Sequence, residues 1–368
     1  MSKTTELADE TYMRAALALA RRGLGSVWPN PAVGCIIVKD DFVVGRGWTQ
    51  LGGRPHAETE ALRRAGPAAS GACAYVTLEP CNHFGETPPC AQALLDAGVA
   101  RVVTAMEDPD PRTSGGGHAR LLARGASVVT DVLQADASRV NAGFLSRVVN
   151  GRPTVTLKSA TTLDGKIAAR GGASRWITGP EARARGHLLR ATHDAIMIGV
   201  GTAIADAPTL TCRIPGLEKS SPVRVVVDSQ LRMPVGSPLV QSARRVPTWI
   251  LTASEPDPAT YETHGVEIVR TDAGPDGRVD LVSGLAALGA RGLTRLLVEG
   301  GGALAASCLQ AALVDRIYWF RAAGIMGDDG VGSVAGYGVA DPANMVRFAR
   351  TDALPVGADM LEIFERQS

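Results

Sequence analysis

The sequence has 368 residues, of which 45% are hydrophobic and 20% are charged. These proportions are typical of a globular protein, and the length exceeds one ordinary core, so we expect two domains. The 38 basic and 37 acidic residues leave a formal net charge of +1, and only 4% of the residues are aromatic. This balance argues against a surface for nucleic acid or anionic membranes, and against a stacking platform for unpaired bases.

The N-terminal stretch MSKTTELADETYMRAALALARRG has acidic residues before a short apolar run, and it predicts an amphipathic helix rather than a signal peptide. No window of the sequence has the roughly 18 apolar residues that a membrane span needs. Six cysteines without a secretory signal do not indicate a disulfide framework. We therefore expect a cytoplasmic protein in which Cys and His residues serve metal binding or catalysis.

The first part of the chain alternates between helical and strand patterns. Helical spacing covers the N-terminal stretch and residues 135–149. Short β-rich runs are expected to be strands at 33–39, 42–48, 73–79, 101–106 and 126–132. Strands that alternate with helices predict a layered α/β domain. Gly151 and Pro153 interrupt the chain after the last helical pattern, so the domains are expected to be 1–150 and 151–368.

The second part starts the alternation again. Its near-continuous apolar runs predict strands buried on both faces, at 154–160, 194–201, 223–229, 248–253, 266–271 and 295–302. Helical patterns cover 180–192, 279–290 and 302–312. The glycine-rich region 321–345 has no assigned element.

Four residues of the first part form a pattern typical of a metal site. His56 lies two residues before Glu58 in PHAETEAL, and Cys81 and Cys90 each follow a proline in LEPCNHFGETPPC. Residues i and i+2 point to different sides of a helix, so His56 and Glu58 are not expected to bind one metal together. A thiol just after a proline is expected at a helix N-terminus, which favours the thiolate.

One imidazole and two thiolates balance the charge of Zn²⁺ and leave a fourth position for water, as in catalytic zinc sites. The pKa of that water falls to about 7, and Glu58 stays free to carry protons. The arrangement is the H-x-E and P-C-x-x-C pattern of zinc deaminases, except that eight residues separate the two cysteines. Alone, H-x-E also suits an exposed helix and each cysteine a buried packing position; together they favour zinc.

A second pattern, RLLVEGGGALAASCLQAAL, predicts a buried strand, a glycine turn and a helix. Backbone N–H groups at such a turn can bind phosphate with the help of the helix dipole. The stretch lacks the full dinucleotide fingerprint, and three glycines after a strand also suit close packing. The pattern alone leaves both interpretations open.

Several stretches, in order, resemble one family. NPAVGCIIV, HAETEAL and VTLEPCNHFGETPPCAQALLDAGVARVV resemble the deaminase half of the bifunctional riboflavin-biosynthesis deaminase–reductases. TLKSATTLDGKIAARGGASRWITG, GVGTAIADAPTLTCR and VEGGG resemble the reductase half, so the resemblance covers about residues 10–320. It implies a cytidine-deaminase-like three-layer domain followed by a dihydrofolate-reductase-like α/β domain. It also implies one zinc ion per chain, NADPH, and a homo-oligomer.

The implied reactions are hydrolytic deamination of 2,5-diamino-6-(5-phosphoribosylamino)pyrimidin-4(3H)-one and NADPH-dependent reduction of its ribosyl group to ribityl. In the deaminase half, the resemblance implies zinc ligands, a proton carrier and pocket residues: His56, Cys81 and Cys90; Glu58; and Asn30, His83 and Asp108.

In the reductase half, the residues implied to contact NADPH are Ala160, Trp176, Thr202, Asp206, Ser229, Gly301, Gly302, Ala303, Leu304, Ala305, Ala306 and Ser307. Those implied to contact the substrate are Lys158, Ser174, Arg190, Leu210, Arg213 and Glu299. Arg190 and Arg213 are of the type that clamps a phosphate, and Lys158 is expected to orient the sugar.

The chain departs from the family pattern in three places. The lysine usual before T-P-P-C is Glu86 here, and the usual DPNP is DPDP, followed by RTSGGG. Because an added carboxylate does not favour an anionic substrate, phosphate binding is expected to fall to another cation such as Arg112. After DRIYWF the usual A-P-K is absent, so a deaminase with a degenerate reductase domain is an alternative.

Two further alternatives are a nucleic-acid-editing deaminase, which the near-neutral charge disfavours, and a zinc-stabilised scaffold without activity. In a scaffold, Glu58→Gln would leave zinc bound and change nothing else. In a catalyst, the same substitution would keep the metal and abolish ammonia release.

Overall fold

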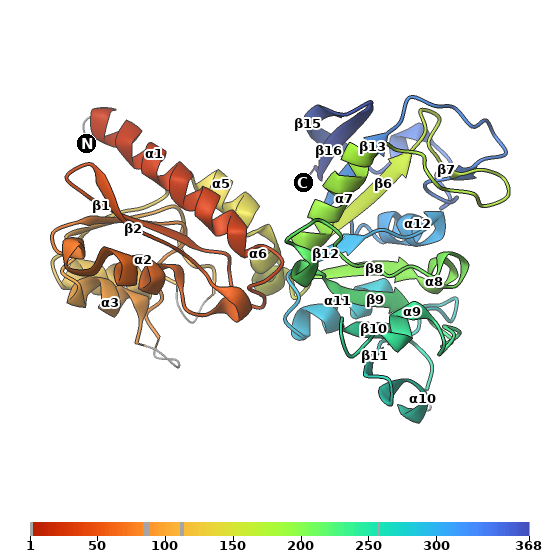
Figure 1. Ribbon diagram of the computed structural model, residues 1–368, viewed down its shortest axis with the longest axis horizontal. Coiled ribbons are helices and arrows are strands. Elements are labelled where there is room, and N and C mark those ends of the chain that lie inside the picture. The colour runs from red at the N-terminus through yellow and green to blue at the C-terminus, as the bar shows by residue number, and fades with distance from the viewer. Residues whose placement is uncertain (1–2, 84–87, 111–113, 256–257, 368) are drawn as a thin grey trace. The chain divides into compact units, whose positions relative to one another are not determined.

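The computed structural model of the protein describes residues 3–83, 88–110, 114–255 and 258–367. The chain divides into two compact units, Met1–Gly151 and Arg152–Ser368 (Figure 1). Gly151 takes a left-handed conformation, with φ 68°, directly after the last helix of the first unit. Glycine is favoured at this position because it adopts a positive φ without strain.

The first unit is built on a five-stranded sheet in the order β2-β1-β3-β4-β5. Its strands are β1 (Gly34–Lys39), β2 (Phe42–Trp48), β3 (Cys73–Val76), β4 (Arg101–Thr104) and β5 (Ser127–Val129). β1 pairs antiparallel with β2 and β3, whereas β3, β4 and β5 run parallel. Parallel neighbours need crossover connections, and helices supply them here.

Helices cover both faces of this sheet, which gives the predicted three layers. The helices are α1 (Lys3–Ala20), α2 (Ala57–Ala65), α3 (Cys90–Asp96), α4 (Gly116–Ala123), α5 (Gln134–Val140) and α6 (Ala142–Asn150). α1 and α5 lie on one face, and α2 and α3 lie on the other (Figure 1).

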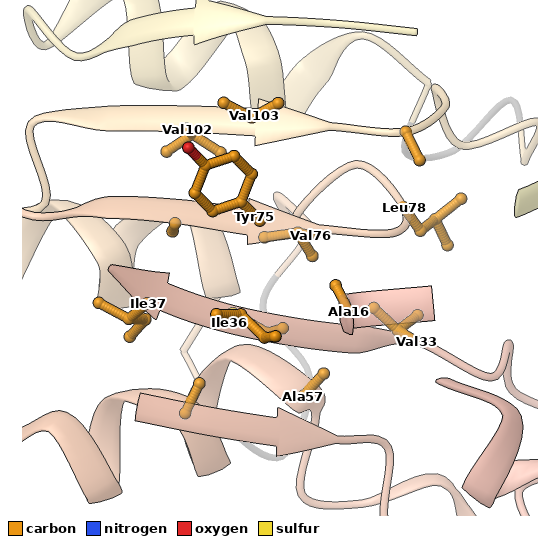
Figure 2. Packing of buried hydrophobic residues seen from close by; sticks show 14 of the residues in the cluster. Ala16, Val33, Ile36, Ile37, Ala57, Tyr75, Val76, Leu78, Val102 and Val103 are labelled. Atoms are coloured by element: carbon orange, nitrogen blue, oxygen red, sulfur yellow. The ribbon is translucent and has the colours of Figure 1, made fainter. Parts of the chain in front are cut away.

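The core of the first unit lies between the sheet and these helix layers. Met13 and Leu17 of α1 and Ala61 of α2 are buried in one cluster with the strands. Figure 2 shows part of this cluster, including the strand residues Ile36, Ile37, Tyr75, Val76, Val102 and Val103. Burial of these apolar side chains is the main stabilising contribution to the unit.

Two glycines of β2 let α2 lie directly on the sheet. A Cβ at Gly47 would lie 2.0 Å from the carbonyl oxygen of Ala57, and one at Gly45 would lie 2.3 Å from that of Ala61. Since no side chain fits there, these glycines set the position of the first turn of α2. His56 immediately precedes that turn, so the sheet positions the candidate metal site.

The second unit is built on a nine-stranded sheet in the order β11-β10-β9-β8-β12-β6-β13-β16-β15. Its strands are β6 (Thr154–Thr161), β8 (Ala195–Gly199), β9 (Val223–Val227), β10 (Thr248–Thr252), β11 (Val266–Arg270), β12 (Arg295–Val298), β13 (Arg316–Arg321), β15 (Phe348–Val356) and β16 (Asp359–Arg366). Neighbours from β11 to β13 are parallel, and the hairpin β15–β16 joins β13 antiparallel. β7 (Lys166–Ala168) and β14 (Val331–Gly332) form a separate two-stranded sheet.

The helices of the second unit connect its parallel strands. They are α7 (Pro180–Ala191), α8 (Val200–Asp206), α9 (Pro238–Gln241), α10 (Pro258–Glu262), α11 (Leu281–Ala290) and α12 (Gly302–Gln310). Short 3₁₀ turns lie at Arg21–Gly23, Leu51–Gly53, Gly66–Ala69, Glu218–Ser220 and Pro342–Asn344.

The structure corrects the sequence prediction in several places, among them the strand expected over 295–302, which ends at Val298, and β13, which was not predicted. The helix expected over 135–149 is two helices, α5 and α6, that meet at the buried Asn141. The side chain of Asn141 is hydrogen-bonded to both backbone groups of Ala32, which interrupts the helix there. Residues 200 and 201 begin α8 instead of ending a strand, and β15 and β16 were not predicted.

Among the helices that the structure describes, none is long and apolar enough to cross a bilayer.

Candidate active sites

His56 and Glu58 lie at the start of α2. His56 is the N-cap residue with extended backbone, and Glu58 is in the first helical turn, where it is 4% exposed. The expectation that both residues are helical is therefore wrong. Because His56 precedes the helix, the directions of the two side chains follow from the cap geometry rather than from helical spacing.

The two cysteines lie on different kinds of backbone. Cys90 is the first residue of α3 after Pro89, as predicted, but Cys81 lies in a loop after β3 and begins no helix. The backbone N–H of Cys90 donates to the Sγ atom of Cys81, at 3.3 Å. The N-terminus of α3 therefore favours a thiolate on Cys81, although Cys81 itself lies outside that helix.

The three predicted ligand side chains converge. The Nδ1 atom of His56 lies 3.3 Å from the Sγ atom of Cys90 and 3.7 Å from that of Cys81. The ligand atoms of all three residues lie within 4.8 Å of one another. Tetrahedral zinc with ordinary Zn–N and Zn–S bonds places N and S about 3.6 Å apart, so the donor set fits Zn²⁺.

The protonation of the site also suits a divalent cation. A hydrogen bond with Cys90 lowers the pKa of Cys81 to about 4. The hydrogen bond with Cys81, together with burial, raises the pKa of Cys90 well above its ordinary value. Without metal, the two sulfur atoms therefore share one proton, and a divalent cation would displace it. Burial raises the pKa of Glu58 to about 7, a value suited to a group that takes up and releases protons near neutral pH.

The residues expected in the deaminase pocket come from three loops. The side chain of Asn30 lies against Gly53, where a Cβ would come within 1.9 Å of its Nδ2 atom. Asp108 follows β4 and is 8% exposed, whereas His83 is exposed. Glu86 and Arg112 lie outside the described residues.

Glu79 is a buried acid that the sequence analysis did not select. Its carboxylate accepts hydrogen bonds from the backbone N–H groups of Asp108, Gly115, Gly117 and His118. Glu79 therefore ties the strand end before Cys81 to the loop that carries Asp108. Its place two residues before Cys81 was the only signal in the sequence.

The second unit contains a cavity of about 430 Å³ at the carboxyl ends of β6, β8 and β12. Ligands of open parallel sheets bind at this edge. Of the residues expected to contact NADPH or substrate, those that line the cavity are Lys158, Ala160, Ser174, Trp176, Thr202, Asp206, Glu299, Gly301 and Ala305.

The N-terminus of α12 forms one wall of this cavity. The Gly301 N–H donates to the Oγ1 atom of Thr202 at 3.3 Å, and a Cβ at Gly302 would lie 2.9 Å from the carbonyl oxygen of Gly332. Backbone N–H groups at a helix N-terminus suit a phosphate, so these residues fit the nucleotide part of NADPH.

The other residues expected to contact NADPH are not among those that line the cavity. Leu304 and Ala306 are buried, whereas Ala303 and Ser307 are exposed on α12. Ser229 follows β9, and its hydroxyl accepts a hydrogen bond from the N–H of Val279.

A largely buried charge network contributes Lys158 and Glu299 to the lining of the cavity. Arg190 makes two hydrogen bonds to Glu299, of 2.8 and 3.1 Å, and the Nζ atom of Lys158 lies 3.6 Å from the same carboxylate. Burial alone would raise the pKa of Glu299, but the two cations outweigh it and lower the pKa to about 2. Arg190 therefore forms an ion pair with Glu299, whereas Arg213 is exposed and donates to the Nε2 atom of His187. Leu210 is buried.

Comparisons with known proteins agree with the two units. The model of the cytidine and deoxycytidylate deaminase zinc-binding region matches residues 7–106, and the model of the RibD C-terminal domain matches residues 153–361. The riboflavin biosynthesis protein RibD of Escherichia coli is 41% identical over 367 residues, covering 96% of this chain and 98% of the relative. That of Aquifex aeolicus is 38% identical, covering 97% and 98%.

Solved structures show the same similarity. Acinetobacter baumannii RibD, form 1, superposes with a TM-score of 0.89 at 34% identity, covering 99% of this chain and 100% of that one. A deaminase/reductase of Thermotoga maritima superposes with a TM-score of 0.89 at 32% identity, with the same coverage.

The folds and the donor set define a zinc-dependent deaminase joined to an NADPH-dependent reductase. The chain belongs to the RibD family, the bifunctional deaminase–reductases of riboflavin biosynthesis. The predicted family, fold class, pair of activities and cofactors are thereby confirmed.

Proposed function

We propose that the first unit deaminates 2,5-diamino-6-(5-phosphoribosylamino)pyrimidin-4(3H)-one and that the second reduces the resulting 5-amino-6-(5-phosphoribosylamino)uracil. The observation that carries this proposal is the convergence of His56, Cys81 and Cys90 beside the buried Glu58. The Thermotoga maritima relative, which aligns over 99% of this chain, is named for the same two activities.

Deamination exchanges an amine for oxygen from water, so protons must move from the water to a ring nitrogen and to the departing ammonia. Zinc supplies a Lewis acid that lowers the pKa of a bound water to about 7. His56, Cys81 and Cys90 would hold the ion. The carboxylate of Glu58 would accept a proton from the water and return it to the leaving nitrogen.

In the pocket of the first unit, we assign substrate contacts to Asn30, His83 and Asp108. Gly53 leaves room for the amide of Asn30, whose donor and acceptor atoms suit the edge of a pyrimidine ring. Glu79 holds the backbone of Asp108 through a hydrogen bond of 3.2 Å, which fixes the loop that presents this carboxylate.

In the second unit, NADPH would supply the reducing equivalent to C1′ of the ring-opened ribose. Lys158 lines the cavity beside Glu299, so its ammonium can orient the sugar hydroxyls. Because Arg190 is paired with Glu299, we assign the phosphate to the exposed Arg213. Ser174 lines the cavity, and the buried Leu210 would close the substrate side by packing.

For NADPH, we propose contacts along the cavity wall formed by β6, α8 and the start of α12. Ala160, Trp176, Thr202, Asp206, Gly301 and Ala305 line this wall. In α12 the backbone N–H groups of Gly302 and Ala303 belong to the first turn, where they suit phosphate, and Leu304 follows them with its N–H donated to the carbonyl oxygen of Gly301. Ala306, Ser307 and Ser229 complete the proposed set.

A paired assay tests the proposal. Purified enzyme is given the diaminopyrimidine, and zinc content, ammonia release and NADPH absorbance are followed. We expect one zinc per chain, ammonia release without NADPH, and NADPH oxidation only after deamination. Ammonia release without any NADPH oxidation would favour the alternative of a degenerate reductase. This alternative is worth testing because Ser333 and Val334, in the region that departs from the family, line the cavity.

We also infer a homo-oligomer that forms through β13, β16 and β15. These strands carry a second cavity, of about 480 Å³, lined by Ile317, Trp319, Phe348 and Phe364 among others. β15 ends the sheet, so its outer edge has no strand partner among the described residues. Light scattering tests this inference: Phe348→Glu should lower the molar mass to that of one chain, and an unchanged mass would contradict it.

A cytoplasmic location is also proposed. All six cysteines are free in the structure, which suits a reducing compartment.

A further inference from the structure

One guanidinium contacts both chain segments that carry the cysteine ligands. On α4, Arg120 donates to the Oδ1 atom of Asn82 at 2.9 Å, and to the Oε1 atom of Gln92 at 2.7 and 3.1 Å. Asn82 directly follows Cys81, and Gln92 lies in the first turn of α3, two residues after Cys90. Arg120 therefore bridges the two thiol-bearing segments.

The helix that carries Arg120 is itself fixed to the same loop. A Cβ at Gly117 would lie 2.0 Å from the carbonyl oxygen of Pro80, so the backbone of α4 rests directly on the residue before Cys81. The Glu79 carboxylate, whose side chain is 1% exposed, accepts hydrogen bonds of 2.8 and 3.1 Å from the N–H groups of Gly117 and His118. α4 cannot slide along the loop without breaking these contacts.

The spacing of the cysteines explains why such a bridge matters. Two residues between ligands would keep both thiols on one turn of backbone, but here eight residues separate them. Local geometry therefore does not set the distance between the two sulfur atoms. The backbone N–H groups of Cys90 and Ala91 donate directly to Cys81, and Arg120 of α4 adds a side-chain bridge between the same two segments.

We propose that Arg120 is a positioning residue for the zinc site, which holds Cys81 and Cys90 at the separation that the metal requires. Partners of the ligand segments orient the ligands, and their loss typically weakens metal binding by about 10- to 100-fold. The proposal rests on the zinc ligands named above. If the wild-type chain binds no zinc, the assignment of those ligands is wrong. The comparison of variants with wild type tests the role of Arg120 alone.

The test is the rate of zinc release from the zinc-loaded full chain into excess chromogenic chelator. Arg120→Met should release zinc about 10- to 100-fold faster than wild type. Arg124→Met is the control: Arg124 is the exposed residue just after the end of α4, the structure shows no hydrogen bond of its side chain, and the variant should match wild type. NADPH oxidation by the second unit should be unchanged in both variants.

Further variants separate positioning from general stability. Arg120→Lys keeps the charge but cannot reach both partners, so it should restore only part of the slow release. Asn82→Ala and Gln92→Ala should each speed zinc release. In double variants with Arg120→Met, their effects on the release rate should not add fully, because all three substitutions remove the same bridge. Cobalt-loaded Arg120→Met should show an altered visible spectrum, which reports ligand geometry.

Wild-type release rates in Arg120→Met would overturn the proposal. If that variant does not fold, Asn82→Ala and Gln92→Ala decide the question, since both leave α4 intact. Wild-type release from both of them would overturn it equally.

Discussion

The zinc site and the reductase cavity obtain their geometry in different ways. In the first unit, three candidate ligand atoms lie within 4.8 Å of one another, and we propose that they and one buried acid carry the chemistry. In the second unit, the cavity is formed by strand ends, the start of α12 and a buried network of Arg190, Lys158 and Glu299. A site of few side chains loses its function when one is removed, whereas removal of one partner from a largely buried charge network is also expected to destabilise the unit.

Removal of the metal is the most drastic way to separate the two sites. Dialysis against a strong chelator should abolish ammonia release, because no side chain replaces the Lewis acid. NADPH oxidation with the deaminated substrate should persist, since none of the zinc ligands lines the reductase cavity. Assays of both reactions before and after zinc is restored check this. Equal loss of both activities would contradict the separation.

Glu299→Gln should damage the second unit more than a surface substitution does. It leaves Arg190, whose side chain is 15% exposed, without a carboxylate, which costs about 3 kcal/mol of folding free energy. Reductase activity should fall with it. Urea unfolding measures the effect, and Glu267→Gln, which breaks the exposed pair with Arg291, is the matched control with a loss below about 1 kcal/mol. Similar losses in both variants would show that the network is not stabilising.

Acidification should weaken the second unit by a smaller amount. Burial lowers the pKa of His193 to about 3 from an ordinary 6.5, and its ring nitrogens bond Leu189 and Thr156. Below pH 6.5, His193 is protonated in the unfolded chain but stays neutral in the folded chain. The free energy of unfolding therefore falls as the pH drops from 6.5 toward 3. Between pH 7 and pH 5 the loss should be about 2 kcal/mol.

Urea midpoints of wild type and His193→Gln at the two pH values check this prediction. The variant should show a flatter pH dependence. Parallel pH profiles would mean that another group causes the acid sensitivity.

The sequence predicted those features whose cause is local. Zinc needs particular residue types, so His56, Cys81 and Cys90 could be selected from residue type and spacing alone, and apolar runs located the central strands. The partner of Arg190 could not be predicted, because Glu299 lies 109 residues away along the chain. Asn141 ends α5 through a contact with Ala32 from the far end of the unit, so helical spacing gave no sign of it.

The backbone around Cys81 shows the same limit. A proline before a cysteine suggested a helix start at both thiols, but only the segment after Pro89 forms a helix. Cys81 receives its hydrogen bond from the backbone of Cys90 instead. The expected thiolate is therefore favoured only at Cys81, because the hydrogen bond with Cys81 and burial raise the pKa of Cys90 although it begins a helix.

The most direct test of the proposed deaminase mechanism is ammonia release by Glu58→Gln, measured together with zinc content. If three side chains hold the metal and Glu58 only transfers protons, the variant keeps one zinc per chain and releases ammonia about 10²- to 10⁴-fold more slowly. Wild-type ammonia release from a zinc-loaded variant would contradict this account.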